Sequence, residues 1–177
     1  MLTLEAARSE LLIIDIQTRL MPAIQEGPAV LARARQLVTA ADRLGVPLLA
    51  TEQNPAGLGP TVAGLLPEGA EVQPKMSFDA LGAPAIAARL TGDRTLIVAG
   101  CEAHVCVLQT VLGLLQRGRR VQVVADAVGS RHAANRKAAL KRMRQAGAGI
   151  VTTEMVLFEW LGSAEHPAFR DIVALIK

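Results

Sequence analysis

Short apolar runs and longer segments with helical periodicity alternate along the whole chain. An uninterrupted apolar run of four or five residues is typical of a strand buried on both faces, and a segment that repeats apolar residues at helical spacing predicts an amphipathic helix. The pattern predicts strands at residues 11–14, 46–50, 71–74, 95–99, 121–125 and 149–152. It predicts helices at residues 29–44, 80–90, 104–117, 133–146 and 154–177, the last broken near Gly162 and Pro167.

This alternation predicts the α/β class, with a parallel sheet of about six strands covered on both faces and joined by right-handed crossovers. No shift in composition divides the chain, so we expect one domain over residues 1–177. Hydrophobic residues make up 51% of the sequence, which excludes intrinsic disorder. Only 2% of the residues are aromatic, so the core must consist mainly of aliphatic side chains.

Neither a membrane nor a secretory role is expected from the apolar segments. The stretch 105–115 is interrupted by Gln109 and Thr110 and falls short of the roughly 20 residues that span a bilayer. No apolar stretch and cleavage site follow a basic start at the N-terminus, so no secretory signal is visible. Two cysteines cannot form a disulfide framework, which favours a reduced, cytoplasmic compartment.

The formal net charge of +3 raises the question of a nucleic-acid partner. Nine basic residues lie within 117–144, against the single acid Asp126. No aromatic residue interleaves them, and those in 136–144 fit one face of a helix. We therefore expect a solvated helix face and no nucleic-acid binding.

Polar side chains with possible chemistry follow the predicted strands. Asp15 ends the first strand, Lys75 follows the third, and Cys106 lies in the first helical turn after the fourth. The carboxyl ends of parallel strands form one rim, where ligands bind in open α/β sheets. A carboxylate, an ammonium and a thiol at this rim would supply a base, a charge partner and a nucleophile. Two further pairs at the same rim are Glu52 with Gln53, and Ser130 with Arg131.

Each of the three residues also has a simpler interpretation. The start of a helix favours an anion, so we expect the Cys106 thiol to ionise easily. The backbone N–H groups of the same helix start could hold the oxyanion that forms when a thiolate attacks a carbonyl. A free cysteine is also commonly a small buried apolar side chain. Asp15 could cap a turn, and Lys75 alone could be an ordinary surface residue.

Several segments of the sequence resemble the isochorismatase-like cysteine hydrolases. Three match the signature segments of that family in order and spacing: LIIDIQ at 12–17, KMSF at 75–78 and GCEAHVCV at 100–107. Three more resemble the isochorismatase domain-containing protein 2 branch: TEQNPAGLGPTV at 51–62, DAVGSR at 126–131 and HPAF at 166–169. The resemblance runs from about residue 9 to residue 176.

The resemblance implies a three-layer α/β/α fold and a catalytic triad of Asp15, Lys75 and Cys106. It also implies a cis peptide bond between Cys101 and Glu102, which would turn the N–H groups of Glu102 and Cys106 toward an oxyanion. The implied reaction is hydrolysis of a small amide or related C–N bond through a thioester on Cys106.

Two departures narrow this expectation. Nicotinamidases of the superfamily bind a metal through Asp and His residues after the second strand, where this sequence has TEQN at 51–54. We therefore expect no metal and no cofactor. Isochorismatases proper lack the nucleophilic cysteine, so the presence of Cys106 disfavours vinyl-ether hydrolysis.

The substrate is expected to be a small molecule, selected by Glu52, Gln53, Ser130 and Arg131. A non-hydrolytic alternative is a thiol-based redox sensor that uses Cys106, and another is a scaffold that has kept the fold. His104 could pair with the thiol, although residues two apart at the start of a helix rarely aim at one point. Cys101 is expected to be buried at the end of its strand. A redox pair with Cys106 is the alternative, although the spacing is not that of a C-x-x-C motif.

The C-terminal segment predicts self-association. Val156, Leu157, Phe158 and Trp160 would make a helix that is apolar on more than one face. We expect a homodimer or higher homo-oligomer in which Trp160 is buried between subunits. The alternative is that the tail folds back and buries these side chains within its own chain.

Overall fold

The computed structural model describes residues 3–177, and a six-stranded parallel sheet lies at its centre. The strands are β1 (Ser9–Ile14), β2 (Leu48–Gln53), β3 (Glu71–Lys75), β4 (Thr95–Cys101), β5 (Val121–Gly129) and β6 (Gly149–Val151). The helices are α1 (Gly27–Leu44), α2 (Pro55–Leu58), α3 (Pro84–Arg89), α4 (Leu108–Gln116), α5 (Ala133–Gln145), α6 (Thr153–Leu161) and α7 (Phe169–Ala174). Three 3₁₀ turns, η1 (Ala6–Arg8), η2 (Met21–Ala23) and η3 (Ala80–Gly82), and a π-helical turn, η4 (Ala103–Val107), complete the list.

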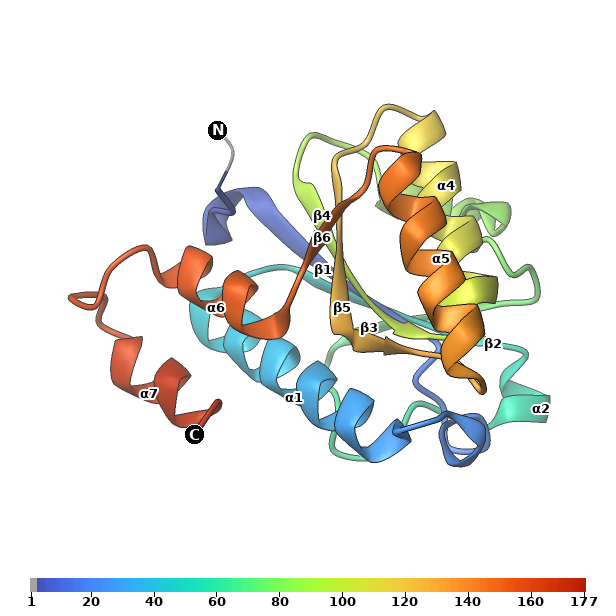
Figure 1. Cartoon of the computed structure of the whole chain (residues 1–177), viewed down its shortest axis with the longest axis horizontal. Helices are drawn as coiled ribbons and strands as arrows, with labels where there is room; N and C mark the ends of the chain where they lie inside the picture. Colours follow the sequence, from blue (N-terminus) through green and yellow to red (C-terminus); the bar gives the residue numbers. More distant parts are fainter. Residues whose placement is uncertain (1–2) are drawn as a thin grey trace.

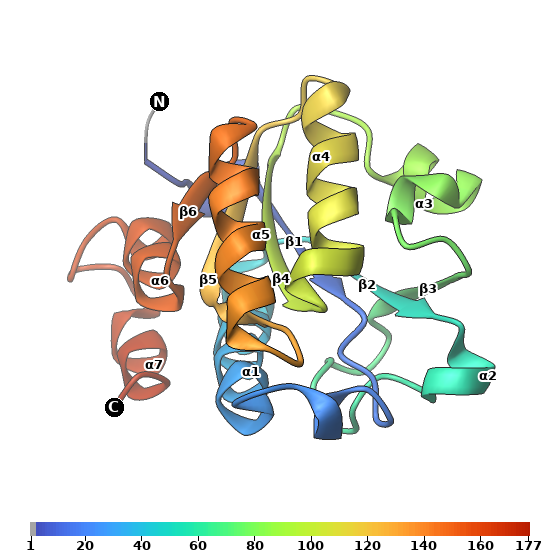
Figure 2. The ribbon, with the colours of Figure 1, turned by 45° about the vertical axis from the view of Figure 1, so that its right-hand side comes forward.

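The strand order is β3-β2-β1-β4-β5-β6, with every neighbouring pair parallel. The helices form a layer on each face: α1 and α6 lie on one side, and α4 and α5 on the other (Figures 1 and 2). The predicted three-layer α/β/α architecture is therefore confirmed. The chain runs outward from β1 to β3 and then returns to place β4 beside β1, so the order reverses between β1 and β4. Ligands bind at such a switch point in this class of sheet.

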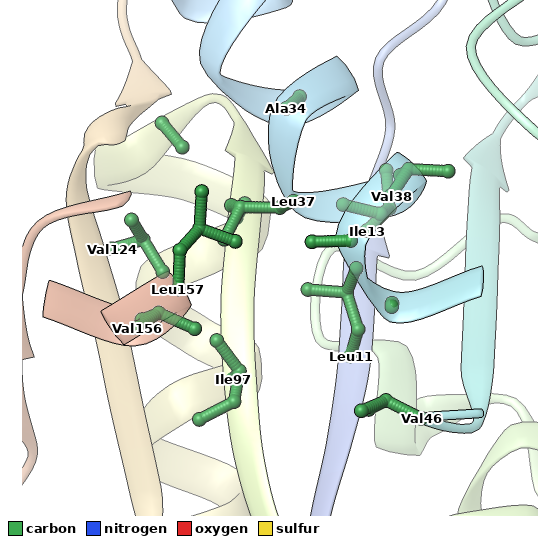
Figure 3. Packing of buried hydrophobic residues seen from close by; sticks show 14 of the residues in the cluster. Leu11, Ile13, Ala34, Leu37, Val38, Val46, Ile97, Val124, Val156 and Leu157 are labelled. Atoms are coloured by element: carbon green, nitrogen blue, oxygen red, sulfur yellow. The ribbon is translucent and has the colours of Figure 1, made fainter. Parts of the chain in front are cut away.

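The sheet divides the core into two clusters, one on each face. β1 is buried along its whole length, and its side chains alternate between the clusters: Leu11 and Ile13 pack on the α1 side, Leu12 and Ile14 on the α4 side. This double burial explains why the strand reads as an unbroken apolar run. Figure 3 shows Leu37 of α1 and Leu157 of α6 packed over the first face.

The predicted elements agree with the structure apart from a few boundaries. The expected helix 80–90 is a 3₁₀ turn followed by α3, with Pro84 at the first position of α3. The expected helix 104–117 starts as the π-helical η4 before it becomes α4. β5 continues to Gly129, four residues beyond the expected strand.

The prediction that Trp160 lies between subunits is wrong. Trp160 is buried within its own chain, and its indole N–H donates to Ser9 Oγ at 3.0 Å. Val156 and Leu157 are fully buried in the same cluster. α6 is apolar on more than one side because it packs against β5, α1 and η1 together. Only Met155 and Phe158 remain exposed as large apolar side chains on this helix.

Candidate active site

Three side chains lie at the edge of the sheet where the strands have their carboxyl ends: Asp15, Lys75 and Cys106. Asp15 follows β1 in a left-handed backbone conformation, and its N–H donates to the carbonyl of Thr51. Lys75 is the last residue of β3, and Cys106 lies in η4 just after β4. Asp15 and Cys106 thus flank the point where the strand order reverses.

Gly100 makes this arrangement possible where β1 and β4 separate. It pairs with Ile14, the residue before Asp15, and has a φ of +133°. A Cβ at this position would lie 2.0 Å from the Ile14 carbonyl oxygen. Only glycine allows both this conformation and so close an approach between the two strands.

A buried ion pair joins Lys75 to Asp15. Lys75 Nζ donates to Asp15 Oδ2 at 2.7 Å, and neither side chain is exposed. Nζ also donates to the carbonyl of Ser77 at 3.2 Å. Thr51 Oγ1 donates to the other carboxylate oxygen, Oδ1, at 2.7 Å. Each Asp15 oxygen thus has a donor, which a buried carboxylate requires.

Thr51 is a site residue that the sequence analysis missed. It lies within β2, is 1% exposed and stands in register with Ile14. The sequence offered one signal for Thr51: it carries a hydroxyl within a buried strand, and the neighbouring strand is followed by Asp15. The side chain's partner, however, becomes evident only when the pairing of β1 with β2 is known.

The Cys106 thiol is buried beside this pair, with 6% exposure. Burial raises the pKa of the Cys106 thiol to about 12, and the charge of Asp15 and a hydrogen bond to it act in the same direction. The Lys75 ammonium acts in the opposite direction and lowers this pKa, but it does not outweigh the burial. The expectation that Cys106 ionises easily is therefore wrong. The reason is that the desolvation of the thiolate exceeds the stabilisation by Lys75.

The backbone between β4 and η4 has the expected cis peptide bond between Cys101 and Glu102. Glu102 then begins the turn that carries Cys106, because its carbonyl accepts from the N–H groups of Val105 and Val107. The Glu102 carboxylate accepts from the backbone N–H of Arg131 at 2.9 Å and from Arg131 Nε at 3.2 Å. The loop after β5 is thereby attached to the loop after β4.

Ser130 and His104 form a second link between these loops. His104 Nδ1 lies 3.0 Å from Ser130 Oγ, and His104 Nε2 lies 3.4 Å from Asn135 Nδ2. These two contacts join the loop after β4 to the loop after β5 and to the start of α5. Ser130 is 1% exposed. Both His104 nitrogens are occupied by these partners on the α5 side.

Glu52 and Gln53 hold the loop that follows β2. Glu52 Oε1 accepts from the N–H of Thr61 at 2.6 Å and from its hydroxyl at 2.8 Å. The N–H of Gln53 donates to Gln17 Oε1, and Gln17 Nε2 donates to the carbonyls of Gln53 and Gly59. Gln17, fully buried, is another residue that the sequence analysis did not single out.

A groove opens beside Lys75 at the edge of the sheet. Its lining consists of Asn54, Pro55, Ala56, Pro74, Lys75, Met76 and Ala83. Lys75 Nζ donates to the carbonyls of Ser77 and Phe78. Two large apolar side chains are exposed at this segment, Met76 at 70% and Phe78 at 51%.

Cys101 lies on the opposite face of the sheet from Cys106. It is fully buried in the α1-side cluster, with its sulfur 3.8 Å from that of Met21, whereas Cys106 belongs to the α4-side cluster. Burial raises the pKa of Cys101 to about 12 as well. Its expected burial is confirmed, and the sheet separates the two thiols.

Within residues 3–177, no group of three or more His, Cys, Asp or Glu side chains is placed to hold a metal ion. The same part of the chain contains no helix with the length and apolarity needed to cross a membrane.

Comparison with known proteins agrees with this geometry. The family model of the isochorismatase domain matches residues 9–155. The chain belongs to the isochorismatase family. The human isochorismatase domain-containing protein 2 is 40% identical over 172 residues, which cover 96% of this chain and 83% of the human protein. This member of the family therefore resembles the branch that its sequence segments indicated.

Two solved structures show the same fold. One, described as a MAR1 ribonuclease from Caenorhabditis elegans, has a TM-score of 0.93 and 38% identity, and the match covers 98% of this chain and 92% of that one. The other, the YcaC gene product from Escherichia coli, is described as an octameric hydrolase of unknown specificity. It has a TM-score of 0.86 and 26% identity over 99% of this chain and 88% of that one.

Proposed function

We propose that this isochorismatase-family protein is a cysteine hydrolase that cleaves a small amide or related C–N bond through a thioester on Cys106. The observation that carries the proposal is the buried Asp15–Lys75 ion pair, whose two charges act on the pKa of the Cys106 thiol in opposite directions. A base held in place by a cation beside a nucleophile is the arrangement that covalent acyl transfer requires.

The high pKa of Cys106 determines the first step. The resting thiol is protonated at neutral pH, so Asp15 accepts its proton as Sγ attacks the carbonyl carbon. The C–S bond forms while the carbonyl electron pair moves to oxygen. The proton transfer leaves the developing thiolate beside the Lys75 ammonium, which favours it.

The remaining steps return the enzyme to its starting state. The tetrahedral intermediate collapses, the C–N bond breaks, and Asp15 gives its proton to the leaving nitrogen. Asp15 then takes a proton from water as the water oxygen attacks the thioester carbon. Expulsion of Sγ, which recovers the proton, releases the carboxylic acid. The N–H groups of Glu102 and Cys106 are proposed to stabilise the oxyanion in both halves of the reaction.

We propose that four residues select the substrate, one by direct contact and three by holding neighbouring groups: Arg131, Glu52, Gln53 and Ser130. Arg131 has an exposed side chain that can touch a substrate directly. The other three act by holding neighbouring groups in place: Glu52 the backbone N–H of Thr61, Gln53 the carbonyl of Met76, and Ser130 the imidazole of His104. We further propose a single domain over residues 1–177, a cytoplasmic location and no catalytic metal. About one zinc, iron or manganese per purified chain would contradict the last of these.

The hydrolase proposal is tested by a panel of small amides, ureides and carbamoyl compounds, with release of ammonia or amine as the measurement. Turnover of at least one compound is expected, together with its loss by at least about a thousandfold in Cys106→Ser. Cys101→Ser is the matched control, since that thiol lies across the sheet. Equal turnover in Cys106→Ser would overturn the proposal.

Two alternatives to the hydrolysis of an amide can be tested with the same variants. The relative described as a ribonuclease makes RNA a substrate to test, and the basic residues exposed on α5 would be its contact surface. RNA cleavage that persists in Cys106→Ser but fails when Lys137 and Lys141 are neutralised would favour that function. A redox sensor is less well supported, because Cys106 is a protonated thiol and Cys101 cannot reach it across the sheet.

We also propose that the protein forms a homo-oligomer, as the E. coli relative does according to its description. The exposed apolar side chains Met76 and Phe78 are candidates for the contact. Light scattering at micromolar concentration decides the point: a mass near the 18.7 kDa of one chain would overturn it.

A further inference from the structure

An apolar groove with a basic edge lies between α4 and α5, the two helices that cover one face of the sheet (Figure 2). Its volume is about 490 Å³, and it is lined by Leu112, Leu115, Gln116, Arg142 and Ala146. Leu112 and Leu115 are only partly buried, so apolar surface remains exposed in the groove. Because α4 contains no charged residue, Arg142 of α5 supplies the charge at the edge of this surface.

The face of the molecule around this groove is strongly basic. Residues 117–144 contain nine Lys and Arg and a single acid, whereas the rest of the chain contains ten basic and fifteen acidic residues. The single acid, Asp126, contacts Arg33 of α1 on the other side of the sheet. No ion pair within residues 3–177 includes Arg142. The α4–α5 face therefore carries positive charge that the chain itself does not compensate, which fits an acidic partner.

A surface of complementary character lies on α6, which packs on the opposite face of the sheet (Figures 1 and 2). Met155 and Phe158 are exposed and three residues apart, so they lie on the same side of this helix. Glu154 is exposed next to them, and none of the ion pairs in the described part of the chain includes it. α6 contains two glutamates and no basic residue. It thus presents an apolar pair with an acidic edge, the counterpart of the groove between α4 and α5.

We infer that α6 of one chain docks into the groove between α4 and α5 of a second copy of this chain. The exposed apolar pair of α6 covers Leu112 and Leu115, and Glu154 faces Arg142. A helix that places its apolar side in a groove, with opposite charges at the edge, is a recurring mode of recognition. The apolar contact supplies the affinity, and the charges select the partner and its orientation.

The contact is head-to-tail, because its two surfaces differ and lie on opposite faces of the sheet. Repetition of such a contact about an axis closes into a ring. The inference rests on the proposed homo-oligomer, but it uses a different surface from Met76 and Phe78 at the end of β3. The two contacts can therefore be tested separately.

The test exchanges the two charges in the whole chain and measures its mass over a range of concentrations by analytical ultracentrifugation. Arg142→Glu and Glu154→Arg each bring like charges together, so each should raise the concentration of half-dissociation at least about tenfold. The double variant pairs opposite charges again, with their positions reversed, and should return this concentration to within about threefold of the wild type. Lys137→Glu, on α5 but outside the groove lining, makes the same change in net charge as Arg142→Glu and should leave the concentration unchanged.

The apolar part of the contact is tested by Phe158→Ser. The variant removes an exposed apolar side chain from the centre of the contact, so it should raise the same concentration at least about tenfold. All of the substituted side chains are exposed, and circular dichroism should show that each variant remains folded. An oligomer that tolerates Phe158→Ser would overturn the inference.

Failure of this contact can be told apart from failure of the proposed self-association. An oligomer that survives both Arg142→Glu and Glu154→Arg would overturn the contact and leave self-association standing. Dissociation by each variant without recovery in the double variant would also overturn the contact, since the two side chains would then not face each other. A wild type that is a monomer at every concentration would overturn both proposals. If the oligomer survives and only Arg142→Glu weakens the binding of a labelled single-stranded RNA, the basic face binds nucleic acid instead of α6.

Discussion

Lys75 Nζ lies 2.7 Å from Asp15 Oδ2, and neither side chain has any exposure to solvent. The pair joins the end of the edge strand β3 to the end of β1, across β2. Thr51 Oγ1 and the carbonyl of Ser77 fill further hydrogen-bonding positions around it. We therefore expect the Lys75–Asp15 ion pair to affect both the stability of this edge of the sheet and the reactivity of the Cys106 thiol.

Removal of the cation should strongly destabilise the protein. Lys75→Met keeps the side-chain length but leaves the Asp15 carboxylate buried without its partner, so the free energy of unfolding should fall by about 3–5 kcal/mol. Urea denaturation followed by circular dichroism measures it. Lys137→Met, on the exposed face of α5, is the control and should change stability by less than about 0.5 kcal/mol. A loss below about 1 kcal/mol for Lys75→Met would show that the pair contributes little.

The reactivity of Cys106 should keep rising at high pH. Its thiol pKa is raised to about 12, so the thiolate fraction, and with it the rate of alkylation by iodoacetamide, should increase about tenfold per pH unit up to and beyond about pH 9. Cys101 should react more slowly at each pH, because it has no exposure whereas Cys106 has 6%. A rate for Cys106 that levels off below about pH 9 would contradict the raised pKa.

Gly100 should not tolerate a side chain. Gly100→Ala would place a methyl group 2.0 Å from the Ile14 carbonyl oxygen at a φ of +133°, and should destabilise the fold by about 3 kcal/mol or more. Gly118→Ala is the matched control, because that glycine also has a positive φ but has no atom within 4 Å of the place where its methyl group would lie. Thermal denaturation compares the two, and equal losses would show that the close approach of β1 and β4 is unimportant.

Replacement of Trp160 should destabilise the fold of the single chain, not merely dissociate an oligomer. Trp160→Ser removes a side chain that is 4% exposed and leaves Ser9 Oγ without its indole donor, so a loss of about 3–5 kcal/mol is expected. Phe158→Ser, on the same helix but 46% exposed, should cost far less. A stable, folded Trp160→Ser monomer would instead return the residue to a subunit interface.

The sequence by itself determined the order of the elements and the edge at which the chemistry gathers. Strand β1 reads as an apolar run because both of its faces are buried, and α1 reads as a helix because only one of its faces is. Parallel strands bring their carboxyl ends to one edge, so Asp15, Lys75 and Cys106 could be placed together from their order along the chain. The cis bond before Glu102 came from the resemblance to a family, since no local rule predicts it.

Tertiary structure alone decided the side-chain partners and the raised pKa of Cys106. Thr51 meets Asp15 only because β1 and β2 pair in one register, and Arg131 meets Glu102 only because β5 lies beside β4. Trp160 was predicted to lie at a subunit interface because the periodicity of a sequence does not show how many elements of the same chain pack around a helix. Cys106 was expected to be acidic because the helix start and Lys75 can be inferred from order, whereas the desolvation that raises its pKa depends on how closely the surrounding side chains pack.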